Sequence, residues 1–285
     1  MNQIILTGAN GFIGKNLLQE LVKEDVEVIA VVRDKKNIKN IANKIKIVEM
    51  DISQPSKEFF EKINSSASLV HLAWNGLTDY KSMAHIETEL PIHFNFVKSL
   101  ILHGVKNITI TGTCFEYGLQ QGMLSENLQT KPITSYGYSK DALRKHLEFF
   151  QNEIDFNLTW LRLFYVYGED QPDNTLFSQL RKAVEKGESF FNMSGGKQLR
   201  DYLHIKDLVK KINILALKQK NFGIINVCSG FPIAVKRLVE DWKKEKGWNI
   251  KLNTGYYDYP SHEPMAFWGD ISKLQKILDE KNEQG

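Results

Sequence analysis

Hydrophobic residues follow two alternating patterns along the chain. Apolar residues at helical spacing predict helices, among them Gly14–Lys23, Ile92–Leu102 and a helix from Tyr136 to Phe150. Short apolar runs rich in β-branched residues predict strands at Ile4–Leu6, Val26–Val32, Ile45–Val48, Leu69–Ala73, Ile108–Ile110, Leu158–Phe164 and Ile224–Cys228. This alternation is typical of an α/β fold in which helices cover both faces of a doubly wound parallel sheet.

The pattern loosens after Phe164. Tyr165–Asp173 contains Gly168 and Pro172 and predicts a loop, and a helix is expected over Asn174–Lys186. We expect residues 1–164 to form the main α/β domain, with segments around 201–230 returning to it. The rest of 165–285 is expected to form a smaller C-terminal lobe.

Composition excludes several classes of protein. The 285 residues are 42% hydrophobic and 25% charged, and the net charge of +3 is spread along the chain rather than clustered as in nucleic-acid-binding proteins. No apolar run approaches the roughly 18 residues that span a bilayer. Cys114 and Cys228 lack metal-ligand spacing, and no metal site is expected. The early first strand argues against a signal peptide, so we expect a cytoplasmic protein.

A glycine-rich turn follows the first predicted strand. Gly8, Gly11 and Gly14 have the spacing of a pyrophosphate cradle, in which the glycines permit a tight turn, close phosphate approach and helix–strand packing. The helix that begins there favours negative charge at its N-terminus. A plain glycine turn is the alternative, but the position between a strand and an amphipathic helix favours a dinucleotide site.

The end of the second predicted strand bears on the choice of cofactor. An acidic residue there would bind the adenosine 2′-hydroxyl of NAD, whereas this strand ends on Val32 and is followed by Arg33. Arginine suits a 2′-phosphate, so we expect NADP (NADPH), with NAD as the alternative; Arg33 could instead pair with Asp34. Asp51 is placed for the adenine edge or for capping a turn.

Further along the chain, Thr113, Tyr136 and Lys140 together predict proton and hydride transfer. Tyr136 and Lys140 are four residues apart, which places them on one face of a helix. A nearby ammonium would lower the pKa of the tyrosine and make it a usable acid or base. Thr113 ends a predicted central strand, where ligands of parallel sheets bind.

These motifs together resemble an extended short-chain dehydrogenase/reductase of the NAD-dependent epimerase/dehydratase group. The resemblance covers nearly the whole chain, and its motifs appear in the family's order. The matching segments are Thr7–Gly14, Asp51–Ile52, His71–Ala73, Thr113–Gly118, Tyr136–Lys140, Arg162–Gly168, Arg200–Asp207 and Asn226–Gly230. It implies a Rossmann fold with a C-terminal substrate lobe, and we expect a homodimer.

Most members of this family act on nucleotide-diphosphate sugars. The resemblance implies that Thr113 and Tyr136 contact the sugar oxygen and that Arg200 meets the diphosphate. Glu116 and Tyr165 are further candidates for substrate contact, and a structural carboxylate is the alternative for Glu116. The expected cofactor contacts are Gly8, Asn10, Gly11, Phe12, Ile13, Gly14, Arg33, Asp51, Ile52, Leu72, Ala73, Tyr136 and Lys140.

Departures from the family pattern narrow the expected reaction. Cys114-Phe115 follows the threonine where sugar 4,6-dehydratases have Asp-Glu, so dehydration is disfavoured. Tyr165 replaces a common asparagine. The Gly112–Gly118 motif resembles 4-ketoreductases of deoxysugar and polysaccharide biosynthesis, which reduce dTDP- or CDP-4-keto-6-deoxyhexoses. A nucleotide-sugar 4-epimerase is the alternative enzyme, and a non-catalytic dinucleotide-binding subunit the alternative of another class.

Several other residues have simpler interpretations than catalysis. Cys114 has no partner of a nucleophile and is expected to be packed. His71 is expected to be buried and hydrogen-bonded. His204 and His262 lie in segments that border the substrate in relatives, whereas Trp242 and Trp248 are expected to anchor the C-terminal lobe.

Overall fold

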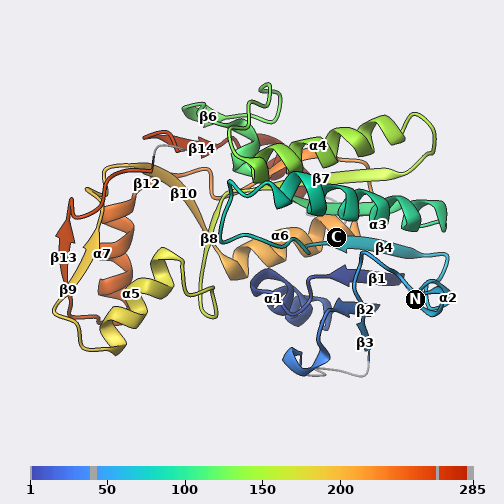
Figure 1. Cartoon of the computed structure of the whole chain (residues 1–285), viewed down its shortest axis with the longest axis horizontal. Helices are drawn as coiled ribbons and strands as arrows, with labels where there is room; N and C mark the ends of the chain where they lie inside the picture. The colour runs from blue at the N-terminus through green and yellow to red at the C-terminus, as the bar shows by residue number, and fades with distance from the viewer. Residues whose placement is uncertain (1, 39–43, 261–262, 281–285) are drawn as a thin grey trace.

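The computed structural model describes residues 2–38, 44–260 and 263–280. Its main feature is a seven-stranded parallel sheet with the strand order β11-β7-β5-β4-β1-β2-β3 (Figure 1). The strands are β1 (Asn2–Thr7), β2 (Val26–Val32), β3 (Ile45–Glu49), β4 (Ala67–His71), β5 (Asn107–Thr113), β7 (Asn157–Leu163) and β11 (Gly223–Val227). The α/β fold predicted from the sequence is confirmed.

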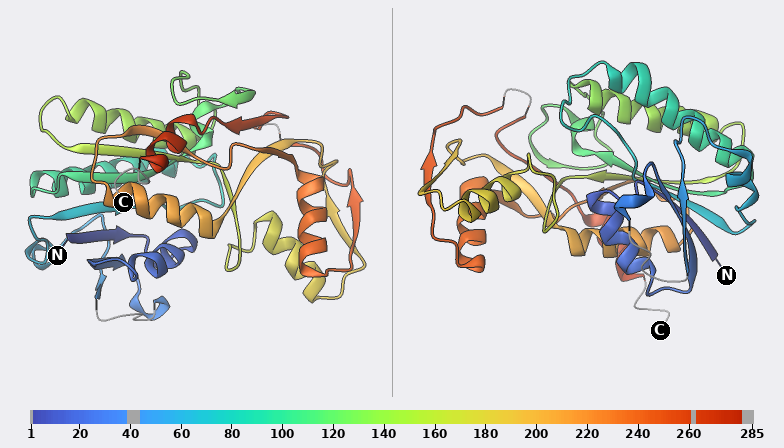
Figure 2. Two further views of the ribbon diagram at one scale, coloured as in Figure 1. Left: turned by 180° about the vertical axis from the view of Figure 1, so that it is seen from behind. Right: turned by 60° about the horizontal axis from the view of Figure 1, so that its bottom comes forward.

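Helices cover both faces of this sheet (Figures 1 and 2). One face packs against α1 (Phe12–Leu21), α6 (Ile205–Leu217) and α8 (Ser272–Asp279). The opposite face packs against α2 (Lys57–Glu61), α3 (Leu90–Leu102) and α4 (Ser135–Phe150).

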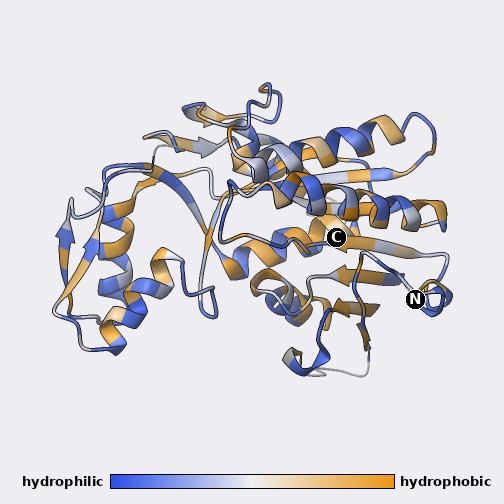
Figure 3. Ribbon diagram, viewed as in Figure 1, coloured by the Kyte–Doolittle hydropathy of each residue, from blue (hydrophilic) through white to orange (hydrophobic). Residues whose placement is uncertain are grey.

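Successive strand residues enter two different hydrophobic cores. In β1, Ile4 and Leu6 face the α1 and α6 side, whereas Ile5 faces the α3 and α4 side. Both faces are covered, so the strands read as continuous apolar runs rather than alternating ones. Figure 3 shows this as predominantly hydrophobic strands beneath amphipathic helices.

A smaller group of elements extends from one end of the main sheet (Figure 1). It contains α5 (Leu176–Glu185), α7 (Val235–Lys246), and the paired strands β9 (Phe190–Met193) and β13 (Lys251–Thr254). Trp242 and Phe177 lie in its core, and Trp248 packs against it.

A three-stranded sheet of β8 (Tyr165–Tyr167), β10 (Leu199–His204) and β12 (Pro232–Ala234) connects this group to the main sheet. The loop predicted over Tyr165–Asp173 is therefore wrong at its start. Tyr165–Tyr167 is a strand because it pairs with β10, and three residues are too few to show a strand pattern. Two further short strands, β6 (Gly122–Leu124) and β14 (Phe267–Gly269), pair with each other.

The strand order reverses between β1 and β4, which are neighbours in the sheet. Connections leave this point toward opposite sides, and in sheets of this kind ligands bind outside the carboxyl ends of the strands. Thr7, His71 and Thr113 end β1, β4 and β5, and all three lie at this edge.

Candidate active site

The glycine turn after β1 has the geometry expected for a phosphate cradle. Gly8 adopts a left-handed φ of +68°, and a Cβ there would lie 2.9 Å from the backbone nitrogen of Ala73. At Gly14 a Cβ would collide with the carbonyl of Gly8 and the Cα of Ala9, so α1 can pack closely on the turn. Gly11 is exposed and leaves its outer side open. The N-terminus of α1 thus offers free backbone amides to an anion.

Asn10, Phe12 and Ile13 of the same turn are half-buried. The second expected wall of the cradle is the turn after β4. The backbone nitrogens of Leu72 and Ala73 donate to the Thr7 hydroxyl over 3.2 and 3.3 Å. Both cofactor turns are therefore fastened to each other.

A buried chain of hydrogen bonds continues from Thr7. Thr7 Oγ1 lies 2.8 Å from His71 Nδ1, His71 Nε2 lies 2.6 Å from His93 Nδ1, and His93 Nε2 lies 3.1 Å from Glu89. Because Thr7 already accepts two N–H groups, its own proton points to His71, and each imidazole donates onward. Burial lowers the pKa of both histidines, which fits two neutral rings.

Glu89 ends this chain as a charged acceptor. Burial alone would raise the pKa of its carboxyl, but donors from His93 and Asn75 lower that pKa to about 2. Asn75 donates from its backbone and its side chain. These hydrogen bonds connect the Leu72–Ala73 turn, through Thr7, to the buried histidines. His71 is buried and hydrogen-bonded, as expected from the sequence.

The far end of the cofactor site carries Arg33 and Asp51. Arg33 is exposed at the end of β2, and no ion pair joins it to Asp34 in the part of the chain that the structure describes. Asp34 instead accepts from the backbone of Lys36. Asp51 accepts from the backbone of Ser53, which together with the nearby Arg33 lowers its pKa. Ile52, beside Asp51, is half-buried.

Tyr136 and Lys140 lie in the first turns of α4. The Thr134 hydroxyl caps this helix by accepting from the backbone of Gly137 over 3.1 Å. Lys140 Nζ donates to the carbonyl of Thr111 over 2.9 Å and lies 4.1 Å from the ring centroid of Trp74. Burial lowers the pKa of Lys140 to about 7, although Glu116 and Glu89 oppose the shift.

An aromatic wall surrounds the Tyr136 phenol. Tyr80 stacks on it with centroids 5.2 Å apart, and the rings of Trp74, His85 and Phe115 lie 5.4 to 6.4 Å from it. Burial and the nearby Tyr80 raise the pKa of Tyr136, and only the neighbouring Thr113 hydroxyl opposes them. The expectation that Lys140 lowers this pKa is wrong for this structure, because the ammonium is directed at Thr111 and Trp74.

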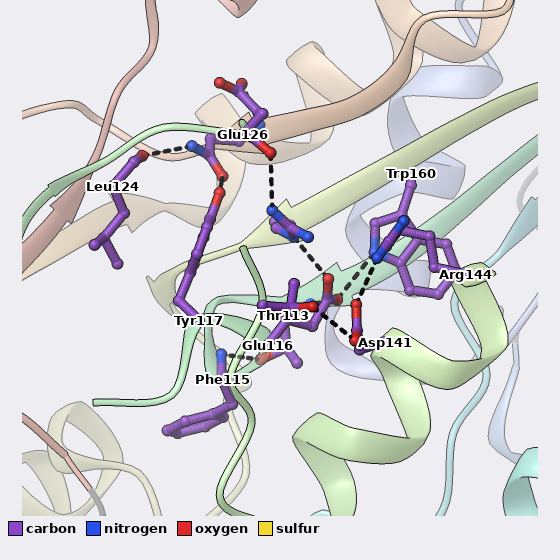
Figure 4. A network of polar contacts seen from close by, with 12 residues as sticks. Thr113, Phe115, Glu116, Tyr117, Leu124, Glu126, Asp141, Arg144 and Trp160 are labelled. Carbon is purple, nitrogen blue, oxygen red and sulfur yellow. Dashed lines mark hydrogen bonds and ion pairs between the residues drawn. The ribbon is translucent and has the colours of Figure 1, made fainter. Parts of the chain in front are cut away.

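Thr113 is held at the start of a short helical turn, Cys114–Tyr117 (Figure 4). Its hydroxyl accepts from the backbone of Phe115 over 3.3 Å. Glu116 reaches back and accepts from the backbone of Thr113 over 2.9 Å. Glu116 has no exposed surface and also binds Trp160 and Arg162. The structure therefore favours the structural interpretation of Glu116 over direct substrate contact.

Arg200 lies on β10 and is also buried. Its Nη2 donates to Glu263 over 2.9 Å, and its guanidinium lies 4.7 Å from the ring centroid of Phe267. The ring of Tyr165 is half-buried against Tyr202 and Phe267. The charges of Arg200 and Glu263 both act on the pKa of Cys114, so the two side chains lie near the residue that follows Thr113.

Other candidate residues have structural surroundings. Burial raises the pKa of the Cys114 thiol, which disfavours a nucleophile. His204 caps α6 by accepting from the backbone of Lys206 over 3.2 Å. His262 lies outside the described residues. In the described ranges, no cluster of three or more His, Cys, Asp or Glu side chains is placed to bind a metal. None of the helices described is long and apolar enough to cross a membrane.

Several residues of the site were not identified from the sequence. Thr7 was visible only as part of the glycine motif, and Trp74 carries no motif. His93 and Glu89 are four residues apart, a spacing that could have identified a histidine–carboxylate pair on one helical face. Glu263 carried no such signal.

The glycine turn after β1 and Thr113 at the end of β5 lie at the same edge of the sheet, and Tyr136 lies next to Thr113. The profile of the NAD dependent epimerase/dehydratase family matches residues 4–228. The chain therefore belongs to this family of NAD-dependent enzymes acting on nucleotide sugars.

Two characterised relatives and one solved structure show its place in the family. dTDP-6-deoxy-L-talose 4-dehydrogenase (NAD(+)) of Aggregatibacter actinomycetemcomitans is 32% identical over 270 residues, covering 93% of this chain and 98% of that protein. dTDP-4-dehydro-6-deoxyglucose reductase of Escherichia coli is 27% identical over 256 residues, covering 84% of this chain and 80% of that protein. UDP-glucuronic acid 4-epimerase from Bacillus cereus, solved with UDP-glucuronic acid and NAD, superposes with a TM-score of 0.83 at 23% identity, covering 97% and 93% of the two chains.

Proposed function

We propose that this enzyme reduces the 4-keto group of a nucleotide-diphosphate 4-keto-6-deoxy sugar, such as dTDP-4-dehydro-6-deoxyglucose, in deoxysugar or polysaccharide biosynthesis. The observation that carries the proposal is the state of Tyr136. Burial among aromatic rings raises its pKa, which keeps the phenol protonated and suits a proton donor. The activities of the two relatives, both at C4 of dTDP-deoxysugars, agree with this chemistry.

Thr113 supplies the second contact to the reacting oxygen. Its acceptor position is occupied by the backbone N–H of Phe115, so its own proton is directed away from that contact and is available as a donor. A hydroxyl donor beside a phenol donor stabilises negative charge that develops on a carbonyl oxygen. Tyr136 then transfers its proton to that oxygen.

The described residues fit a nicotinamide dinucleotide. Gly8 and Gly14 let the turn and α1 pack closely, Gly11 leaves its outer side open, and α1 presents its N-terminus there. When bound, the cofactor supplies the hydride. Lys140 is proposed to bind its ribose, because Lys140 and Tyr136 lie four residues apart on α4.

Arg33 supports NADPH as the preferred cofactor. It is exposed at the end of β2, and the neighbouring Asp34 is engaged in capping its own turn. The Aggregatibacter actinomycetemcomitans relative is named for NAD(+), so both cofactors are compared directly. The measurement is kcat/KM for NADPH over NADH, in the wild type and in Arg33→Ala. We expect the ratio to exceed one and to fall in the variant; an unchanged ratio would exclude Arg33 as its cause.

A 4-epimerase is the second candidate, favoured by the fold of the Bacillus cereus enzyme. An epimerase returns the hydride to its substrate and tends to retain the dinucleotide, whereas a reductase exchanges it at every turnover. The decisive assay follows NADPH and NADH oxidation against a panel of nucleotide 4-keto-6-deoxy sugars. Stoichiometric oxidation supports the reductase, and interconversion of C4 epimers without net oxidation supports the epimerase.

Arg200 is proposed to bind the substrate diphosphate. It already forms an ion pair with Glu263, so a diphosphate has to share or displace that carboxylate. We expect Arg200→Ala to weaken binding of dTDP or CDP by about 10- to 100-fold and Glu263→Gln to strengthen it. Titration calorimetry measures both, and NADPH affinity is the control that stays constant.

We also propose a homodimer. Two neighbouring helices carry large apolar residues that remain 51 to 72% exposed: Leu102 on α3, and Tyr138 and Phe149 on α4. Sedimentation of the wild type and of Phe149→Asp tests this face, because a buried charge there would shift the protein toward the monomer.

A further inference from the structure

The carboxylate of Glu116 lies beneath the strand end that carries Thr113 (Figure 4). Its Oε1 accepts from the Thr113 backbone and from Trp160 Nε1, each over 2.9 Å, and its Oε2 accepts from Arg162 Nε over 2.7 Å. Glu116 is 0% and Arg162 1% exposed. A buried charge with three donors is a fully satisfied group and not one that awaits a ligand.

The strand leaves room for this carboxylate at Gly112. A Cβ at that position would collide with Trp160 Nε1 and with Glu116 Oε1. The space above Gly112 is thus filled by the contact between Trp160 and Glu116. The absence of a side chain at Gly112 therefore provides the space in which the Glu116 carboxylate meets Trp160.

Glu116 and Thr113 form a capping box around the same turn. The bond of Glu116 to the Thr113 backbone closes the turn in which Thr113 accepts from Phe115. Losing the carboxylate would free the Thr113 backbone and leave Arg162 as an unpaired buried charge.

The same charge acts on the two proton-carrying side chains. Glu116 raises the pKa of Tyr136, after burial and Tyr80, and it also raises the pKa of Lys140 against burial. Other groups that act on the two residues are Tyr80, Cys114, Thr113 and His85 at Tyr136, and Glu89 with the Thr111 carbonyl at Lys140. Arg162 faces Glu116 from β7, beyond the carboxylate.

We propose that Glu116 is a positioning residue of the reductase, whose carboxylate orients Thr113 and places one buried negative charge beside Tyr136 and Lys140. The inference rests on the proposed function, since a reductase needs a protonated Tyr136 as its proton donor. Glu116 itself contacts no substrate.

The test is Glu116→Gln, which preserves shape and one acceptor but removes the charge. Without that charge the phenolate of Tyr136 is less repelled and the ammonium of Lys140 less stabilised, so both pKa values fall. We expect kcat to drop on the order of 10- to 100-fold and KM for NADPH to stay unchanged. The alkaline limb of the kcat–pH profile, where Lys140 loses its proton, should move to lower pH.

Glu126→Gln is the matched control. Glu126 belongs to the same polar network, where it accepts from the backbone of Asn226 over 2.8 Å, but it is not among the groups that shift Tyr136 or Lys140. This variant is expected to keep the wild-type kcat and alkaline limb even if its Tm falls. Should Glu116→Gln move only Tm, as a purely structural carboxylate would, the proposal is overturned.

Two further measurements keep the test decisive. If Glu116→Gln does not fold, Glu116→Gln/Arg162→Gln removes the orphaned guanidinium and is expected to show the same downward shift; an unshifted limb contradicts the proposal. If the wild type reduces no sugar of the panel, the proposed function fails separately. The pKa of Lys140 is then measured by NMR titration, with Lys140→Met to assign the signal, and Glu116→Gln still has to lower it.

Discussion

Burial controls the protonation of Tyr136 and Lys140 more strongly than their proximity to each other. The phenol is enclosed by aromatic rings, and the ammonium is engaged by a carbonyl and the face of Trp74. Desolvation disfavours the charged form of each group, so it raises the pKa of the tyrosine and lowers that of the lysine.

Tyr136→Phe is expected to abolish proton donation while keeping the aromatic wall. Because only the phenolic oxygen is lost, kcat should fall by roughly 10²- to 10⁴-fold with unchanged Kd for NADPH. Steady-state kinetics and cofactor titration measure the two quantities. A variant that retains more than about a tenth of the wild-type kcat would exclude Tyr136 as the acid.

Lys140 makes stability depend on pH. Its pKa is about 7 in the fold and 10.5 as an unperturbed side chain, so between these values the unfolded chain binds a proton that the fold does not. Stability must then rise with pH across this window, by at most about 1.4 kcal/mol per pH unit. Urea unfolding of the cofactor-free protein at pH 7 and pH 9 measures the slope. Lys140→Met should have the smaller slope; equal slopes would contradict a neutral buried lysine.

In the turn between β1 and α1, Gly14 and Gly11 meet different surroundings. Gly14 is needed for packing, because a Cβ would meet the Gly8 carbonyl and the backbone of Ala9. Gly11 meets only the Gly8 carbonyl, at 3.2 Å, and its other side is open. The two glycines therefore serve the fold and the ligand respectively.

We expect Gly14→Ala to destabilise the protein by roughly 1–3 kcal/mol and Gly11→Ala to leave stability nearly unchanged. Gly11→Ala should instead weaken dinucleotide binding at least tenfold, because its methyl group occupies the path of the pyrophosphate. Thermal unfolding and cofactor titration of both variants test the separation. Equal losses of stability would refute it.

Over the whole molecule, Asp201 fastens the three-stranded sheet to the main one. It is fully buried on β10, and its two oxygens accept from Ser229, Gly230 and Gly269 over 2.6 to 3.3 Å. Ser229 and Gly230 follow β11 of the main sheet, and Gly269 ends β14. One carboxylate thus joins three separate parts of the chain.

Asp201→Asn should lower the free energy of unfolding by about 2–4 kcal/mol, because the amide nitrogen cannot accept from the N–H groups it faces. Asp241→Asn is the control, since Asp241 forms only a surface ion pair with Arg237 and should change stability by about 1 kcal/mol or less. Urea unfolding compares them. Similar effects of the two substitutions would show that Asp201 does not join the sheets.

The sequence by itself determined the α/β fold, the glycine turn and the placement of Thr113, Tyr136 and Lys140. Each depends on spacing within one element, and helix and strand geometry convert such spacing directly into position. The tertiary structure decided the roles of Glu116, His93 and Glu263. Their partners lie far along the chain: Glu116 and Arg162 are 46 positions apart, and Arg200 and Glu263 are 63 positions apart. It also decided the direction of the Tyr136 pKa shift, because desolvation depends on all the groups that surround a side chain and no local pattern records them.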